Sequence, residues 1–412
     1  MHTPSCMYWA TIVREKLHRN IKAIYGLAFF NSFLIVVPVI VPFFMAKGLS
    51  LAEIFYLQAV FATTIVIFEA PSGYFADLFG RRIALVIGAV IHGLAYLSLN
   101  FANDLATLMV FEILAGIAAS LISGADIALL YDSQKALEDD AASEHSGGIA
   151  NLSFIRSSAE GLGALFGGAL ALFSFDLMVL IQSIAAWVCL LMALLIVEPP
   201  APDATTPKAR IKIGTILHHL FRTDPILRHV VLAIPLYNLA SFHVAWLTQP
   251  YWEAQGISLA MFGVLWFSQS LTVAVANKLG FQLERRWGAV FVLALIGVLP
   301  IIGHFGMAWL EGWYGIVFGL LLFVCRGLNQ VILVNALNRR VPSEFRATAN
   351  SFTSFLFRLA FIITGPVVGF LAEARGLQAT LTVLGVASVF LLVLIMLPLM
   401  QSVKAIQRGV TA

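Results

Sequence analysis

Twelve long apolar stretches, separated by short polar segments, make up most of the 412 residues. A helix rises about 1.5 Å per residue, so roughly 20 apolar residues cross a hydrocarbon core of about 30 Å. A membrane barrel would instead alternate apolar and polar residues over roughly ten-residue segments, and continuous apolar runs such as 83–99 do not. A mean hydropathy of +0.91 with 11% charged residues is also outside the balance of a soluble chain. We therefore expect an all-α membrane protein.

The expected spans form two groups of six on either side of a polar segment with several prolines, residues 198–226. The first group is 21–46, 51–76, 83–101, 105–133, 148–174 and 177–197, and the second is 227–252, 258–282, 289–309, 313–338, 347–372 and 377–400. Because prolines and charges at this density interrupt helices, we interpret 198–226 as a linker. The chain then divides into an N-terminal segment (1–20), two six-helix halves (21–197 and 227–400), the linker, and a tail (401–412).

The placement of Lys and Arg predicts the orientation of the chain. With the N-terminal segment inside, the loops on the outer side hold only Lys47 and Arg375 of the 25 Lys and Arg residues. The positive-inside rule then predicts a multi-pass protein of the cell inner membrane with both termini, the linker and the tail in the cytoplasm. The net charge of +3 is a topology signal, and no basic patch suited to nucleic acid is present.

The chain resembles itself at a shift of 208 residues. This shift aligns residues 42–52 with 250–260, matching at six of eleven positions, and places Gly80 on Gly288. Chance similarity between two membrane turns is one explanation. The equal span counts on both sides of the linker favour the other, a parallel repeat of two six-helix halves about an axis along the membrane normal.

The loop after the second span reads Gly73-Tyr-Phe-Ala-Asp77-Leu-Phe-Gly80-Arg81-Arg82. It resembles the signature cytoplasmic loop of the major facilitator superfamily, with Leu78 where the family usually has a basic residue. We expect Gly73 to let helices approach closely, Asp77 to accept from N–H groups at a helix start, and the two arginines to pair with acids at other helix ends. Alternatively, the arginines serve only as topology determinants. The resemblance implies that Asp132 reaches the loop arginines, so the expected gating latch comprises Gly73, Asp77, Gly80, Arg81, Arg82 and Asp132.

Residues 69–73, 123–133, 346–351 and 365–369 are similar to segments of a large bacterial branch of facilitators whose substrates vary or are unassigned. The resemblance implies twelve helices in two halves. Two departures weigh against a drug antiporter. Glu112 stands where those proteins usually have Arg, and Ala164 stands where they usually have Pro.

Charged residues inside the expected spans each need a partner, a wet cavity or a function, because a mid-membrane charge costs at least about 2.5–3.5 kcal/mol. Asp126 and Arg156 fall at similar depth, and they form either a structural ion pair or part of the transport site. A poorly solvated carboxylate can bind a proton near neutral pH, so Glu112 and Glu160 are candidate proton carriers, followed by Asp126 and Glu69. Arg326 and Arg358 would suit an anionic substrate group or would pair with an acid of the first half.

In the fold that the resemblance implies, the first, fourth, seventh and tenth spans face a central cavity. Candidate substrate-binding residues are therefore Asn31, Glu112, Asn238, His243, Trp246, Arg326 and Arg358. A lone histidine in a helix is also commonly a packed, hydrogen-bonding residue, and this second interpretation of His243 stays open.

These observations predict a secondary active transporter that moves a small amphipathic or anionic organic solute by rocking of the two halves, coupled to protons and working in export. The alternatives are a proton-coupled importer of a nutrient or metal chelate, and a facilitator-like sensor that transports nothing. We find no nucleophile–base constellation, phosphate loop or metal-ligand spacing, so we expect neither an enzyme nor a cofactor nor a metal site. The expected partners are the solute, protons and membrane lipid, and we expect a monomer.

Overall fold

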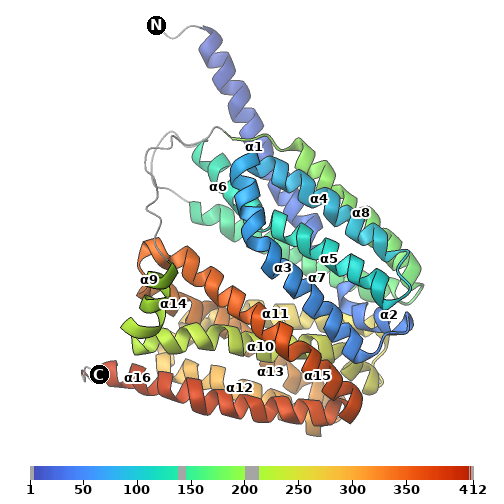
Figure 1. Cartoon of the computed structure of the whole chain (residues 1–412), viewed down its shortest axis with the longest axis vertical. Helices are drawn as coiled ribbons and strands as arrows, with labels where there is room; N and C mark the ends of the chain where they lie inside the picture. The colour runs from blue at the N-terminus through green and yellow to red at the C-terminus, as the bar shows by residue number, and fades with distance from the viewer. Residues whose placement is uncertain (1–3, 138–144, 200–212, 408, 410–412) are drawn as a thin grey trace. The chain divides into compact units, whose positions relative to one another are not determined.

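A computed structural model describes residues 4–137, 145–199, 213–407 and 409. Every regular element in these ranges is helical (Figure 1). The chain forms two compact units. Unit 1 contains Met1–Phe43 and Val60–Pro207, and unit 2 contains Phe44–Ala59 and Lys208–Ala412. The start of the second expected span, residues 51–59, therefore packs with the helices of unit 2.

The helices from the first half of the sequence are interrupted twice inside expected spans. They are α1 (Pro4–Ser32), the 3₁₀ turn η1 (Val37–Val39), α2 (Ile40–Ala46), α3 (Leu51–Phe79), α4 (Arg81–Leu99), α5 (Leu105–Ile122), α6 (Ala125–Lys135), α7 (His145–Leu170) and α8 (Phe175–Leu195). α1 begins at Pro4, so the described part of the expected N-terminal segment continues the helix of the first span. The expected spans 21–46 and 105–133 are each broken, at residues 33–36 and 123–124.

The first break is accommodated by neighbouring helices of unit 1. The backbone N–H of Ile35 donates to Oε1 of buried Gln182 at 2.6 Å, which satisfies a group that the interrupted helix leaves free. A Cβ at Gly167 of α7 would lie 1.9 Å from the Ile35 carbonyl oxygen, and one at Gly163 would lie 2.9 Å from the Leu34 nitrogen. The glycines of the fifth span thus admit the non-helical backbone of the first.

The helices from the second half follow the same order. They are α9 (Ile213–His218), the π-helical η2 (His219–Thr223), α10 (Pro225–Ala254), α11 (Leu259–Trp287), α12 (Ala289–Trp309), α13 (Gly312–Leu328), the π-helical η3 (Asn329–Leu333), α14 (Val334–Arg340), the 3₁₀ turn η4 (Ser343–Phe345), α15 (Arg346–Leu391), the π-helical η5 (Leu392–Met396) and α16 (Leu397–Gln407). The expected linker ends in a short helix, and α10 starts at Pro225 with the Asp224 side chain accepting from the Ile226 N–H.

Ten segments of the described chain are long and apolar enough to cross a membrane. One of them, Arg346–Gln407, holds two expected spans, because the backbone turns at Gly376 with φ 79°. α7 occupies the place of the expected span 148–174 and is not among the ten. The structure therefore agrees with twelve membrane-crossing helices.

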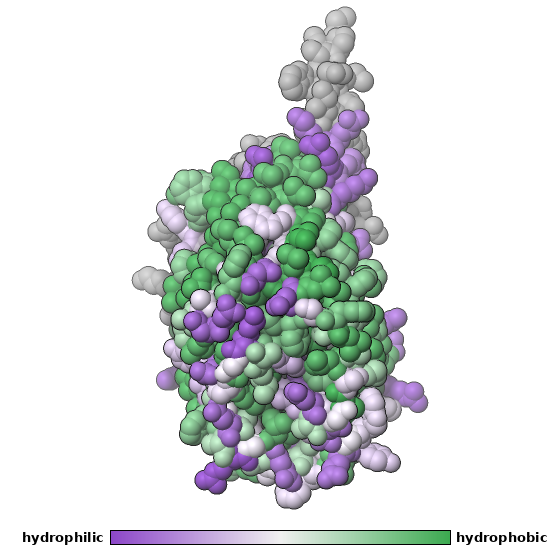
Figure 2. Space-filling view, turned by 90° about the vertical axis from the view of Figure 1, so that its right-hand side faces the viewer, coloured by the Kyte–Doolittle hydropathy of each residue, from purple (hydrophilic) through white to green (hydrophobic). Residues whose placement is uncertain are grey.

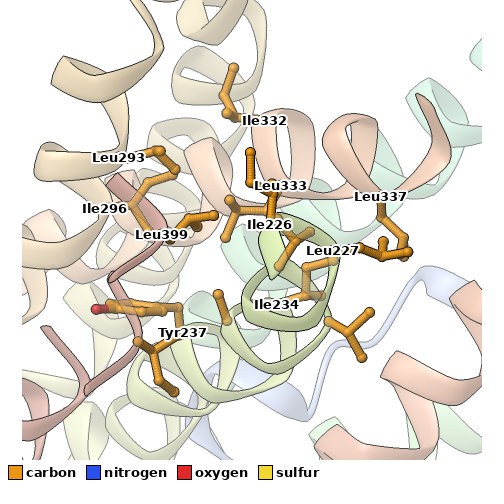
Figure 3. Close-up of a cluster of buried hydrophobic side chains, with 14 of the residues drawn as sticks. Ile226, Leu227, Ile234, Tyr237, Leu293, Ile296, Ile332, Leu333, Leu337 and Leu399 are labelled. Carbon is orange, nitrogen blue, oxygen red and sulfur yellow. The ribbon is translucent and has the colours of Figure 1, made fainter. Parts of the chain in front are cut away.

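Each unit has its own hydrophobic core. In unit 1, buried side chains of α1, α4, α6 and α8 pack together, among them Ile24, Leu85, Leu129 and Cys189. In unit 2, the core joins α10, α12, α13, α14 and α16 and includes Tyr237 (Figure 3). Hydrophobic side chains also cover much of the surface shown in Figure 2. Exposed apolar residues such as Ile184 and Phe370 are appropriate where lipid is the solvent.

Candidate functional site: charged groups at helix starts and breaks

The signature loop joins α3 to α4 through Gly80, whose φ of 96° favours glycine. Directly after this turn, Arg81 forms an ion pair with Asp132 near the end of α6. Its guanidinium also donates to the Ala128 carbonyl oxygen at 3.1 Å. The acid of the fourth span therefore reaches the loop, as expected, and the contact fixes α4 against α6.

Glu198, a residue that sequence reasoning treated only as the start of the linker, completes this cluster. Its carboxylate accepts from the backbone N–H groups of Arg81 at 3.0 Å and Arg82 at 2.8 Å. These are orphan donors at the positive end of α4, where a carboxylate is favourable. The only sequence signal was an acid directly after the sixth span.

Two further members of the expected latch are Gly73 and Asp77. A Cβ at Gly73 would meet no heavy atom within 4 Å in this structure, so the close helix approach expected at this glycine stays a prediction. The exposed Asp77 has no hydrogen bond or ion pair with any other residue that the structure describes. The carboxylate that accepts from the start of α4 is that of Glu198 instead.

Asp126 lies in the first turn of α6, because the fourth span breaks at Ser123 and at Gly124, where φ is 85°. Its side chain is 1% exposed and forms an ion pair with Arg156 of α7, whose side chain is 34% exposed. The Ile127 N–H donates to Asp126 Oδ1 at 2.7 Å. A helix start inside a candidate span thus holds a buried carboxylate and a partly accessible guanidinium. The sequence suggested the pairing but not the break.

The other acids of unit 1 differ in burial. Glu112, on α5, is 3% exposed and has an interaction partner. Glu160 is exposed on α7, one turn after Arg156, and the acid that pairs with Arg156 is Asp126. Glu69 is exposed on α3 and also interacts with another group. Glu112 is therefore the buried one of the two candidate proton carriers.

The polar candidates of the seventh span lie on α10. His243 is buried, and its Nε2 lies 3.0 Å from the Thr364 hydroxyl of α15. The Asn238 side-chain oxygen is buried without a hydrogen-bond partner among the described residues. Trp246 is half-buried and packs edge-on against Phe242. His243 is thus a packed, hydrogen-bonding residue, whereas Asn238 keeps an acceptor available.

Three further candidates sit in half-buried positions. Asn31 is the penultimate residue of α1, directly before the break. Arg326, on α13, and Arg358, on α15, each interact with another group. Arg326 is followed by the π-helical segment Asn329–Leu333, which the 208-residue shift places opposite residues 121–125, where the fourth span breaks. Both repeats therefore depart from α-helix at the same position.

The fold indicates the class of protein to which the chain belongs. Two helical units, with a span interrupted next to the buried charge of Asp126, are typical of secondary transporters. The family model of the Major Facilitator Superfamily matches residues 23–338. The chain belongs to this superfamily, and it is a multi-pass membrane transporter of that type.

Similar proteins support the same assignment. The uncharacterized MFS-type transporter YxaM of Bacillus subtilis (strain 168) is 23% identical, over 87% of this chain and 90% of that protein. The quinolone resistance protein NorA of Staphylococcus aureus (strain MSSA476) is 21% identical, over 50% of this chain and 54% of that protein.

Solved structures match the fold over nearly the whole chain. The nucleoside transporter NupG gives a TM-score of 0.71 at 14% identity, over 94% of this chain and 98% of that one. A bacterial homologue of the human lysosomal transporter Spinster, inward-facing and unoccupied, gives 0.71 at 17% identity and covers all of both chains. At these identities the likeness concerns the fold alone.

Proposed function

We propose that this transporter moves a small amphipathic or anionic organic solute by alternating access, coupled to protons and working in export from the cytoplasm. It acts in the cell inner membrane with both termini in the cytoplasm, in keeping with the placement of Lys and Arg. Similarity to a quinolone resistance protein supports an organic solute and export.

The observation that carries the proposal is the interrupted fourth span. Transporters commonly hold substrates and coupling ions at discontinuous helices, where half-helix ends and unwound backbone supply polar groups. Here the break at 123–124 places a helix start and the Asp126 carboxylate inside the candidate span Leu105–Lys135, and the Arg156 guanidinium reaches them from α7. One partner is buried and the other is partly accessible. An anionic solute group can therefore approach the accessible side of the Arg156 guanidinium while Asp126 stays buried.

Coupling is assigned to Glu112 and Glu160, with Glu112 preferred. Keeping a carboxylate charged at 3% exposure within a span costs free energy that protonation removes. A proton that binds in one conformation and leaves in the other would link the gradient to solute movement. Arg81 with Asp132 then serves as the latch that holds α4 against α6 in one of these conformations.

A transport assay in oriented proteoliposomes tests the proposal. The solute would first be found by thermal-shift screening of the purified protein, because a ligand of the folded state raises its apparent stability. We expect an imposed pH gradient to drive accumulation. Glu112→Gln should abolish that accumulation while solute exchange without a gradient persists, since exchange moves no net protons.

Glu253→Gln is the matched control, because Glu253 is an exposed acid at the end of α10. Wild-type pH dependence in both Glu112→Gln and Glu160→Gln would contradict the assignment of the proton. Accumulation in the opposite direction would instead favour an importer.

A further inference from the structure

A cavity of about 270 Å³ opens in unit 2, where α11 ends and α12 begins. Its apolar wall includes Ile226, Leu293, Ile332 and Leu399, which belong to the core drawn in Figure 3. At roughly 30 Å³ per water molecule, the space equals about nine waters, which suits one small polar headgroup. The wall alone would not select a ligand.

The polar lining residues lie at helix ends. Arg339 and Arg340 end α14, and Glu284 lies in the last turn of α11. Arg340 forms an ion pair with Asp224. Among the residues that the structure describes, neither Glu284 nor Arg339 has an ion-pair partner. The mouth of the cavity therefore offers one free cation and one free anion.

The internal repeat explains why the cavity exists. The 208-residue shift places Ala289 opposite Arg81, Arg340 opposite Asp132 and Ile406 opposite Glu198. In unit 1 these three residues fill the start of α4 with an ion pair and a carboxylate on the helix N–H groups. In unit 2, the short side chain of Ala289 does not fill the corresponding space at the start of α12, and it lines the cavity instead. No side chain in the described part of unit 2 accepts from the first N–H groups of α12.

We propose that this cavity binds the headgroup of a zwitterionic phospholipid. The phosphate lies at the start of α12, where Glu198 binds in the other repeat, and Arg339 supplies the counter-charge. The headgroup amine pairs with Glu284, and the acyl chains leave along the apolar wall towards Val403. A turn between two membrane spans lies at the level of lipid headgroups, which makes a phospholipid the occupant rather than a free phosphate compound.

Native mass spectrometry of the full-length protein, released from nanodiscs of phosphatidylethanolamine, tests the proposal. We expect one tightly retained lipid on the wild-type protein. Arg339→Gln removes one charge-assisted contact and should weaken retention about tenfold. Ala336→Phe fills the cavity from α14 and should abolish retention. Arg286→Gln is the matched control, because Arg286 is exposed, lies against the Trp287 ring and is not part of the lining.

The lipid source is tested with three further probes. Diacylglycerol, which lacks the phosphate, should not be retained, and phosphatidylglycerol, which lacks the amine, should bind more weakly than phosphatidylethanolamine. Inorganic phosphate should leave the lipid in place. Arg339 is exposed, so Arg339→Gln remains informative even if Ala336→Phe fails to fold. Equal retention in Arg339→Gln and wild type, or retention of inorganic phosphate without lipid, would overturn the proposal. The readout is independent of transport.

Discussion

Arg156→Ala should destabilise the protein more than Asp126→Asn, although both break the same ion pair. Losing Arg156 leaves the Asp126 carboxylate, 1% exposed, without its cation although it still accepts from the Ile127 N–H, and we expect a cost of about 3 kcal/mol. Losing the charge of Asp126 leaves a guanidinium that is 34% exposed. In the proposed transport site this accessible part of the guanidinium faces an aqueous cavity, so water screens it and the cost should be only about 1 kcal/mol.

A double-mutant cycle measures the interaction itself. The double variant, Asp126→Asn with Arg156→Ala, has no uncompensated buried charge. We therefore expect it to be more stable than Arg156→Ala alone, with a coupling free energy of about 1–2 kcal/mol. Unfolding would be followed by denaturant titration in mixed micelles. Glu160 provides the control cycle with Arg156, because it lies one turn away on the same helix but is not the acid that Arg156 pairs with. That cycle should give a coupling near zero.

Equal costs for the two single variants would refute the reasoning from unequal burial. Additive effects in the Asp126 and Arg156 cycle would show that the two side chains do not interact in the membrane. A larger coupling free energy with Glu160 than with Asp126 would show that Arg156 pairs with Glu160 instead.

Three further predictions concern the latch, the helix break and a cap. Arg81→Ala should change how readily introduced cysteines are labelled from each side of the membrane, because the latch no longer holds one conformation, and Arg82→Ala should change the labelling less. The double variant with Arg81→Asp and Asp132→Arg, which keeps the two charges opposite, should restore the labelling of the wild type. Gly167→Ala should cost about 1–3 kcal/mol in unfolding free energy, because the added Cβ meets the broken first span. Gly73→Ala should be neutral or stabilising by up to about 1 kcal/mol. Similar losses in both variants would contradict the packing argument. Outside the spans, the Thr107 backbone N–H and hydroxyl hold the pKa of Asp104 below its usual value. Its contribution should therefore be complete above about pH 4 and be lost as the pH falls through the lowered pKa, which thermal unfolding of wild type against Asp104→Asn would show as a difference that shrinks in acid.

Part of the candidate site could be predicted from residue types and spacing alone. Asp132 lies at the end of the fourth span, two spans after the signature loop. Its contact with Arg81 could therefore be predicted from the family pattern. The pairing of Asp126 with Arg156 follows from equal depth and opposite charge. Glu198 was missed, because an acid after the sixth span approaches the start of α4 only once the helices have packed.

The sequence by itself determined the class of protein, since long apolar stretches have one stable arrangement in lipid, helices with all backbone groups paired. It also determined the repeat and the family. Only the tertiary structure decided where those helices are interrupted. A break such as that at Ile35 is stable because Gln182 and Gly167, distant in sequence, supply a hydrogen bond and room for a carbonyl. Such compensation depends on which helices become neighbours, and local sequence does not specify that.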